Sequence, residues 1–359
     1  MQFNNYTPFP GIAWEVVDAG GTWSVAAVAR ARFKLEAGAE PGRIDLVPDP
    51  EQGELFAADV FFGEPDRSSV RYESDFVPFK AHTDVVLNAN AVAPGGRMRR
   101  RWQCGVRILS KEETLLKEYR LNVRGGLNQY KAGVVWWTGM RHRAERVPVR
   151  YERAKGGTVS IPARGKRKEK FLKVDPYNPA GCGIKKIRDP KWTVSVPQIT
   201  YAGLPKWTRV PPGFGFVNRA WKSRSKLAGT YDEAWVERQH PLPPHDFDVR
   251  HNQAAHPELV MEGYLQGGSR VELLHLLEGE PLQWFEVPDL ELIARVRMHT
   301  GDICRKMNLD TVLVDIDGEG GAEPGVFVSW RALLPRPLEP DAAEVMMVTR
   351  QEEEEVKHG

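Results

Sequence analysis

The stretch SSVRYESDFVPFKAHTDVVLNANAVAPGG, residues 68–96, carries the clearest structural pattern in this chain. If residues 70–76 are extended, Arg71, Glu73 and Asp75 fall on one face, because successive side chains of a strand point to opposite sides. A row of one arginine and two carboxylates predicts an ionic ladder along the strand rather than a plain solvent face. The pattern favours a β structure in which charge helps to fix strand register.

The second half of this stretch predicts another strand. Pro78 interrupts the first one, because proline has no amide hydrogen to donate within a central sheet. Alternation resumes over residues 83–91 and ends at the Pro-Gly-Gly turn of residues 94–96. The predicted inward positions are Val85, Leu87, Ala89 and Ala91, and the predicted outward positions are Asp84, Asn88 and Asn90.

The composition restricts the classes of partner. Of the 359 residues, 41% are hydrophobic and 27% are charged, as in ordinary globular proteins. The 50 basic and 48 acidic residues give a net charge of +2, so no global field selects a nucleic acid or a membrane. Two basic runs, residues 97–101 and 164–170, are more typical of solvated loops or of contacts with an acidic protein partner.

The high glycine and proline content, together with 11 tryptophans, favours many short strands joined by ordered turns. We predict a mainly β protein with antiparallel, β-sandwich-like subdomains, long Pro/Gly-rich loops and one or two short helices. The predicted divisions are a β-sandwich-like subdomain over residues 1–125, a second β-rich subdomain with irregular loops and a short helix over residues 126–335, and a disordered acidic tail over residues 336–359. Further strands are predicted over residues 23–35, 55–62, 97–109, 115–123, 262–265, 270–277, 283–287, 290–299, 311–317 and 326–333.

One helix is predicted over residues 231–239. Thr230 and Glu233 have the spacing of a capping box, in which each side chain satisfies an amide group at the start of the helix. Pro241 would end this helix, and residues 241–244, PLPP, are expected to form stiff, semi-extended chain.

Glu73 and Asp75 are the first candidates for catalysis. Two residues apart on a strand, they would be separated by about 6.6 Å, within the range for an inverting glycosidase. Arg71 opposes this role, because a nearby cation favours ionised carboxylates whereas a general acid needs a raised pKa. A structural ion ladder is the favoured interpretation. It comprises Arg71, Glu73, Asp75, Lys80, and the related run Arg150, Glu152 and Arg153.

The histidines give no metal-binding pattern. His240, His245, His251 and His256 lie near one another in the sequence, but their spacing matches neither a zinc-protease helix nor a zinc finger. The proline-rich setting could still bring two of them together. We predict no metal site.

Other catalytic and targeting patterns are also missing from the sequence. Cys104, Cys182 and Cys304 lie far apart and form no disulfide framework. There is no nucleophile elbow and no phosphate-binding glycine loop, so we predict neither an enzyme nor a cofactor. The first residues lack the basic and apolar regions of a signal peptide, and no segment is apolar enough to span a membrane, so we expect a cytoplasmic protein.

A set of short motifs, in order along roughly residues 1–335, resembles one bacterial family. The motifs are Asn5-x-Thr7-Pro8-Phe9, Ser69-x-Arg71-Tyr72-Glu73-Ser74-Asp75, Val149-x-Tyr151-Glu152-Arg153, Asn178-Pro179-x-Gly181-x-Gly183, Gly229-Thr230-Tyr231-Asp232-x-x-Trp235 and Pro244-x-Asp246-Phe247-Asp248. In these residues the chain resembles the domain-of-unknown-function 2169 family. Its members are regarded as adaptors or chaperones of the type VI secretion system and are typically encoded beside spike, PAAR-tip and toxin proteins.

The resemblance implies a non-enzymatic adaptor that binds a toxin effector, a PAAR-type spike tip, or both, and helps to load the effector. One alternative is a carbohydrate- or cell-wall-acting protein that uses Glu73, Asp75 and the surface tryptophans Trp136, Trp137 or Trp207. Another is a structural component that stays in the secreted spike particle. The predicted partner-docking residues are Phe79, Phe214, Phe216, Trp221, Tyr231, Trp235, Asp246, Phe247 and Asp248.

Overall fold

The computed structural model describes residues 2–65, 67–161, 171–184, 191–203, 209–298, 301–336 and 344–349. It confirms a mainly β protein in which antiparallel pairing predominates, and the described ranges contain two short α-helices. Neither helix in these ranges is long and apolar enough to cross a membrane. Residues 164–170, Trp207 and the glutamates at 352–355 lie outside the described ranges.

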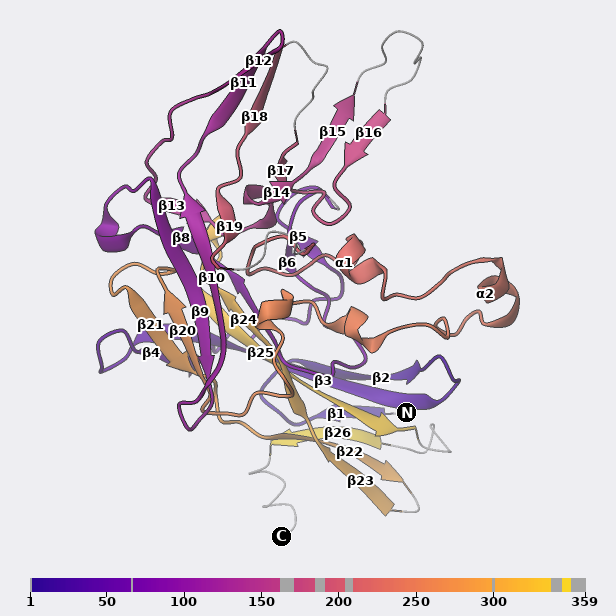
Figure 1. The fold of residues 1–359 in the computed structure, drawn as a ribbon. Helices are drawn as coiled ribbons and strands as arrows, with labels where there is room; N and C mark the ends of the chain where they lie inside the picture. The colour runs from indigo at the N-terminus through magenta and orange to yellow at the C-terminus, as the bar shows by residue number, and fades with distance from the viewer. Residues whose placement is uncertain are drawn as a thin grey trace.

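The largest sheet has six strands and lies across the middle of the molecule (Figure 1). Its order is β2-β3-β25-β24-β7, with β4 paired to the other end of β3. The pairing of β3 with β25 runs from Ser24 opposite Pro335 to Lys34 opposite Gly325, and β7 lies parallel to β24. The strands are β2 (Gly11–Val17), β3 (Trp23–Ala37), β4 (Ile44–Pro48), β7 (Asp84–Asn88), β24 (Asn308–Asp315) and β25 (Gly325–Pro335).

A second large sheet has the order β19-β10-β9-β20-β21. The predicted hairpin of residues 97–109 and 115–123 forms its centre, and the Ser110 N–H closes the turn onto the Thr114 carbonyl at 2.8 Å. Both large sheets contain strands from before and after residue 125. The strands are β9 (Arg101–Leu109), β10 (Leu115–Arg124), β19 (Ile199–Tyr201), β20 (Arg270–Leu274) and β21 (Leu282–Glu286).

Smaller sheets surround these two. The order β1-β26-β22-β23 forms a four-stranded sheet at the lower end of Figure 1, and β12-β11-β18 projects from the opposite end. Three 3-10 helices, η1 (Pro94–Gly96), η2 (Tyr151–Arg153) and η5 (Glu319–Gly321), lie in connections. The strands are β1 (Gln2–Asn5), β26 (Glu344–Thr349), β22 (Leu292–Met298), β23 (Gly301–Lys306), β11 (Asn128–Ala132), β12 (Val135–Thr138) and β18 (Lys191–Ser195).

Short two-stranded pairs complete the described structure: β5 (Val60–Phe61) with β6 (Val70–Tyr72), β8 (Asn90–Val92) with β13 (Arg146–Pro148), β14 (Lys155–Gly156) with β17 (Cys182–Gly183), and β15 (Thr158–Ile161) with β16 (Phe171–Val174). The remaining helices are α1 (Lys222–Ser225), α2 (Glu233–Arg238), η3 (Val249–Asn252) and η4 (Pro257–Leu259).

One apolar core joins the two large sheets. Its buried members include Phe33 of β3, Val328 of β25, Ile108 of β9 and Val271 of β20. Burial of apolar area from strands that are distant in sequence is the main force holding this arrangement together.

Four sequence-based predictions of local structure are wrong. Residues 70–76 are not one strand, because β6 ends at Tyr72, and residues 262–265 form no strand. Helix α2 is present, but its cap is Asp232, whose carboxylate accepts from the Trp235 N–H at 2.9 Å, and not Thr230. Residues 344–349, predicted to be disordered, form β26 between β1 and β22.

Candidate functional site

Glu73 is buried in a double ion pair. Its Oε1 lies 2.8 Å from Arg224 Nη2 and 3.3 Å from Arg219 Nη2. Arg224 comes from α1, and it also donates to the backbone carbonyls of Val217 and His251. The guanidinium of Arg224 therefore fixes the Glu73 carboxylate against a segment about 150 residues later in the chain.

Asp75 is held by a different arginine. Its Oδ2 accepts from Arg30 Nη1 at 2.5 Å and from the Phe56 N–H at 2.7 Å, and its carbonyl accepts from Arg331 at 2.9 Å. Burial raises the pKa of Asp75, and the charge of Arg30 offsets part of this rise. Arg30 of β3 is itself buried.

Glu73 and Asp75 line a small cavity together with Lys80. Its volume is about 30 Å³, enough for one or two water molecules. Small-molecule sites have volumes on the order of 300–1,000 Å³. The arrangement of the two carboxylates is therefore that of a buried ionic network and offers no room for a sugar ring.

Lys80 joins a third group of buried charges. Its Nζ lies 2.8 Å from Asp84 Oδ2 and 3.1 Å from Thr311 Oγ1. Asp84 also accepts from the Gln253 side chain and from the Ala254 N–H, each at 2.8 Å. The prediction that Asp84 and Asn88 face outward is wrong, because β7 is covered on both sides and both residues are buried.

In the described part of the chain, Arg71 forms no ion pair with Glu73 or Asp75. It binds the end of β24 and the turn that follows, with Nη2 3.4 Å from Asp315 and 3.5 Å from Asp317, and Nη1 2.9 Å from the Glu319 carbonyl. The ladder predicted along one strand is thus wrong. The three charged residues point to three separate parts of the fold, because the chain leaves the strand after Tyr72.

The sequence Arg-Tyr-Glu occurs twice, at residues 71–73 and 150–152, and the arginines of both triplets meet at this turn. Arg150 forms an ion pair with the Glu319 carboxylate, next to the Glu319 carbonyl bound by Arg71. Both guanidiniums also lie over the Phe62 ring, at 5.4 Å for Arg71 and 4.1 Å for Arg150. Arg150 of the second triplet therefore binds the same turn as Arg71, through contacts of its own.

Glu152 and Arg153 fasten neighbouring segments. The Glu152 carboxylate accepts from the Ser69 N–H at 2.7 Å and from the Ser69 hydroxyl at 2.6 Å. Arg153 Nη1 donates to the Gln198 side chain at 3.1 Å. The Ser69 and Glu152 motifs, more than 80 residues apart in sequence, are thus bonded directly.

Three of the predicted docking residues belong to the interior. Phe214, Phe216 and Trp221 are buried; Trp221 packs edge-on against Tyr151 at 5.1 Å, and Phe214 packs edge-on against Tyr119. The prediction that these three side chains contact a partner is wrong in this structure, because the protein's own residues cover them. Phe79 is half-buried.

The remaining predicted docking residues lie on an arm, residues 226–248, that projects from the body and carries α2 at its tip (Figure 1). Tyr231 is 59% exposed and Val236, also on the arm, is 61% exposed. Trp235 is half-buried and donates from Nε1 to the Leu242 carbonyl at 3.0 Å. The arm thus combines exposed apolar side chains with a fixed backbone.

Asp246, Phe247 and Asp248 shape the base of the arm. Asp246 accepts from both the N–H and the hydroxyl of Thr230, which closes the arm on itself. Asp248 accepts from the N–H and guanidinium of Arg250, and Phe247 packs edge-on against His251. The two aspartates therefore mainly stabilise the local backbone conformation of this segment.

The four histidines have separate surroundings. His256 is buried, stacks on Tyr119 at 4.6 Å and lies 3.0 Å from the Tyr201 hydroxyl. His240 packs against Trp235, and His245 is exposed. Across the described part of the chain, no three His, Cys, Asp or Glu side chains are placed to hold a metal ion.

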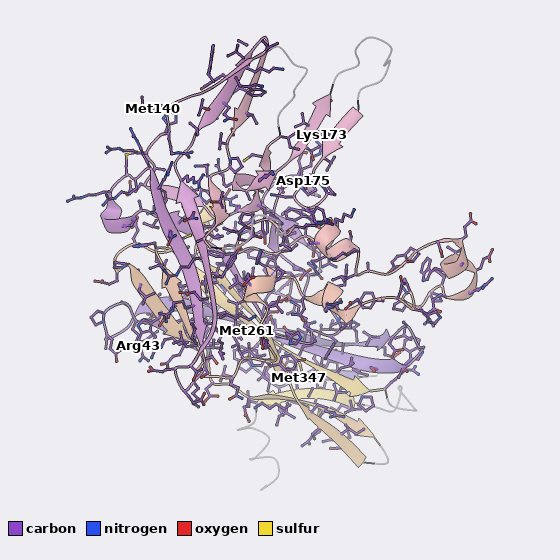
Figure 2. The ribbon with its side chains drawn as sticks, viewed as in Figure 1. Arg43, Met140, Lys173, Asp175, Met261 and Met347 are labelled. Atoms are coloured by element: carbon purple, nitrogen blue, oxygen red, sulfur yellow. The ribbon has the colours of Figure 1, made fainter. Side chains whose placement is uncertain are left out.

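Sequence reasoning missed one exposed apolar feature. The β11–β12 hairpin leaves Val134 94%, Trp137 55% and Met140 77% exposed, and Met140 lies on the surface beside the hairpin (Figure 2). From the sequence we named Trp136 and Trp137 as surface side chains for the carbohydrate alternative, but we predicted neither the hairpin nor its apolar tip. The signal was the apolar run VVWW directly after a turn glycine, which is unusual for a solvated hairpin tip.

Residues 21–331 match the family model described as an uncharacterized protein conserved in bacteria, DUF2169. The chain belongs to this family. No curated protein and no solved structure matches the chain.

Two motifs of the DUF2169 chain lock together through a glycine. Gly156 has φ 151°, and a Cβ atom there would lie 2.3 Å from the Asn178 carbonyl oxygen. Asn178 is buried, and its Nδ2 donates to the carbonyls of Tyr151 and Lys155 at 2.9 and 3.0 Å. Only glycine permits this approach of the two segments.

Proposed function

We propose that this DUF2169 protein is a non-enzymatic adaptor or chaperone of the type VI secretion system. It binds a toxin effector, a PAAR-type spike tip, or both, and helps to load the effector onto the spike. The ordered motifs along the chain support the assignment to this secretion system.

The observation that carries the proposal is the projecting arm with exposed Tyr231 and Val236 at its tip. An extended element with apolar side chains and a backbone fixed by its own hydrogen bonds suits the capture of another protein, because little conformational freedom is lost on binding. Exposed aromatic side chains are also the kind that dominate binding energy at interfaces.

The buried ionic network supports a scaffolding role for the charged motifs. Glu73, Asp75 and Arg71 each have a counter-charge from a distant segment, and Lys80 is paired with Asp84, four residues along the chain. Breaking such a pair is costly, so these residues suit fixing one arrangement of the chain rather than turnover of a substrate.

Co-purification from the native cell tests the proposal. A tagged copy should recover a spike, tip or toxin protein, and deletion should lower the amount of toxin that is loaded. Recovery of none of these components, with toxin levels unchanged on deletion, would reject the adaptor function. Assay of the culture medium then separates a chaperone, which stays behind, from a structural part, which leaves with the spike.

A further inference from the structure

One end of the second large sheet concentrates positive charge. Arg101 of β9 lies directly opposite Arg124 of β10. Like charges at directly opposed strand positions repel each other. Arg141 joins them: its Nη1 donates to the Gly125 carbonyl at 2.9 Å, and burial together with the charges of Arg124 and Arg101 lowers its pKa.

These arginines have no counter-charge of their own. Arg99, Arg101, Arg124 and Arg141 form no ion pair with any residue in the described ranges. Arg107, farther along β9, is in contrast paired with Glu272 at 2.8 Å. A negatively charged ligand bound here would reduce the repulsion among these arginines.

A surface pocket of about 450 Å³ opens beside the cluster. Arg99 and Arg101 line it, together with Trp102. The guanidinium groups of these two arginines are hydrogen-bond donors only. The wall is therefore suited to carboxylate oxygens, which are acceptors only.

Exposed apolar side chains continue from this charged end. Tyr130 and Trp137 are cross-strand partners in the β11–β12 hairpin, and both are exposed. The segments that join the hairpin to the cluster run side by side, with the His142 N–H bonded to the Gly126 carbonyl at 2.9 Å. Met140, the residue before Arg141 in the sequence, is 77% exposed and lies beside the hairpin (Figure 2).

We propose that Arg99, Arg101, Arg124, Arg141, Trp137 and Met140 form a docking surface, here named the arginine–tryptophan surface, for an acidic segment of a partner protein. The segment carries several carboxylates and at least one large apolar side chain. The inference deepens the proposed adaptor function and rests on it for the existence of a protein partner. The arm and this surface would then contact different parts of the assembly.

The observations favour a peptide over a nucleic acid. Arg99, Arg101, Arg124 and Arg141 lie together at one end of one sheet, while the whole chain has a net charge of only +2. Nucleic-acid binders usually carry a basic excess over a whole domain, because they follow many phosphates. Trp137 and Met140 supply instead the apolar anchor that protein interfaces use.

Fluorescence anisotropy with a synthetic probe tests this surface. The probe is a labelled peptide of about 14 residues in which glutamates alternate with leucine and tryptophan; the comparison probes are its Glu-to-Gln analogue and a thymidine oligonucleotide of similar length. We expect a Kd in the tens of micromolar for the acidic peptide, weakened about tenfold in the Gln analogue. The double variant Arg101→Glu/Arg141→Glu should weaken binding of the acidic peptide by about tenfold or more.

The matched control is Arg305→Glu, an exposed arginine on β23 at the far end of the molecule. The milder variant Arg101→Gln/Arg141→Gln should keep or raise the melting temperature, because it removes repulsion, and should still weaken the acidic peptide. Tighter binding of the oligonucleotide than of the peptide, or equal binding by the variants and wild type, would overturn the inference.

The proposed function is tested separately. If the wild-type protein and the Arg101→Glu/Arg141→Glu variant recover the same secretion components from cells, in equal amounts, the adaptor function stands and this docking surface is rejected. If the wild-type protein recovers none but binds the acidic peptide through the arginines, the surface stands and the adaptor function is rejected.

Discussion

Glu73 and Arg224 form an ion pair of 2.8 Å in which both side chains are more than nine-tenths buried. This relationship decides how the acidic motif is to be interpreted. A carboxylate fixed by one buried arginine and approached by a second, Arg219, serves to join the strand region to α1. Removing one member of such a pair leaves an uncompensated charge in the interior.

Arg224→Met should therefore destabilise the protein by about 3–5 kcal/mol. Glu73→Gln/Arg224→Met should recover part of this loss, because the double variant leaves no unpaired charge. Guanidinium denaturation measures both, and Arg238→Met, at an exposed position on α2, is the control and should change stability by less than about 0.5 kcal/mol. Unchanged stability in Glu73→Gln, accompanied by loss of polysaccharide hydrolysis, would instead favour the catalytic alternative.

Arg71→Ala should destabilise the protein by about 1–3 kcal/mol, because Asp315 and Asp317 are buried and lose a donor. Arg150→Ala removes the second arginine from the same turn, so the two losses should not add. A double-mutant cycle in thermal or chemical unfolding measures the coupling. If Arg71→Ala kept the wild-type melting temperature and abolished partner recovery, Arg71 would belong to the interface.

His256 predicts a loss of stability in acid. Burial lowers its pKa to about 3, whereas an unfolded histidine has a pKa near 6.5. Because the folded pKa is lowered, the unfolded chain binds the proton first as the pH falls. The contribution of neutral His256 is fully present above pH 6.5 and is lost as the pH falls toward 3, at no more than about 1.4 kcal/mol per pH unit.

Denaturation at pH 7, 6 and 5 measures this slope. His256→Asn keeps a side-chain acceptor for the Glu258 N–H and cannot titrate, so it should lower stability at pH 7 and flatten the pH dependence. Burial also lowers the pKa of His251 and His275, so part of the slope should remain. His245→Asn, at an exposed position, is the control; an unchanged slope in His256→Asn would contradict the assignment.

The arm predicts a separation of binding from stability. Tyr231→Ala and Val236→Glu change exposed side chains, so each should shift the free energy of unfolding by less than about 0.5 kcal/mol. Each should nevertheless reduce recovery of the partner about tenfold if the arm is the docking element. Quantitative co-purification measures the effect, with Leu116→Ser, an exposed apolar position on β10, as the control. Equal recovery by all variants would place docking elsewhere.

Local structure could be predicted wherever short-range pattern controls it. The alternation in β3, the hairpin of β9 and β10 and the strands β24 and β25 follow from period-two patterning and turn residues. The prediction failed at residues 73–76 and 262–265, where backbone and side chains bond to distant segments instead of to a neighbouring strand. The predicted cap residue Thr230 is not the cap, because its N–H and hydroxyl both donate to the distant Asp246 carboxylate.

The candidate site was predictable only in its residue types. The sequence alone determined that Arg71, Glu73, Asp75 and Lys80 belong to an ionic framework, that the fold is mainly β and that the chain resembles its family. Tertiary structure alone decided which charges pair. The partners of Arg71, Glu73 and Asp75 lie far away in sequence, and only Lys80 pairs with a near neighbour, Asp84. It also decided which aromatic side chains are covered. Pairing and burial depend on contacts across the whole fold, which a local pattern of residues does not encode.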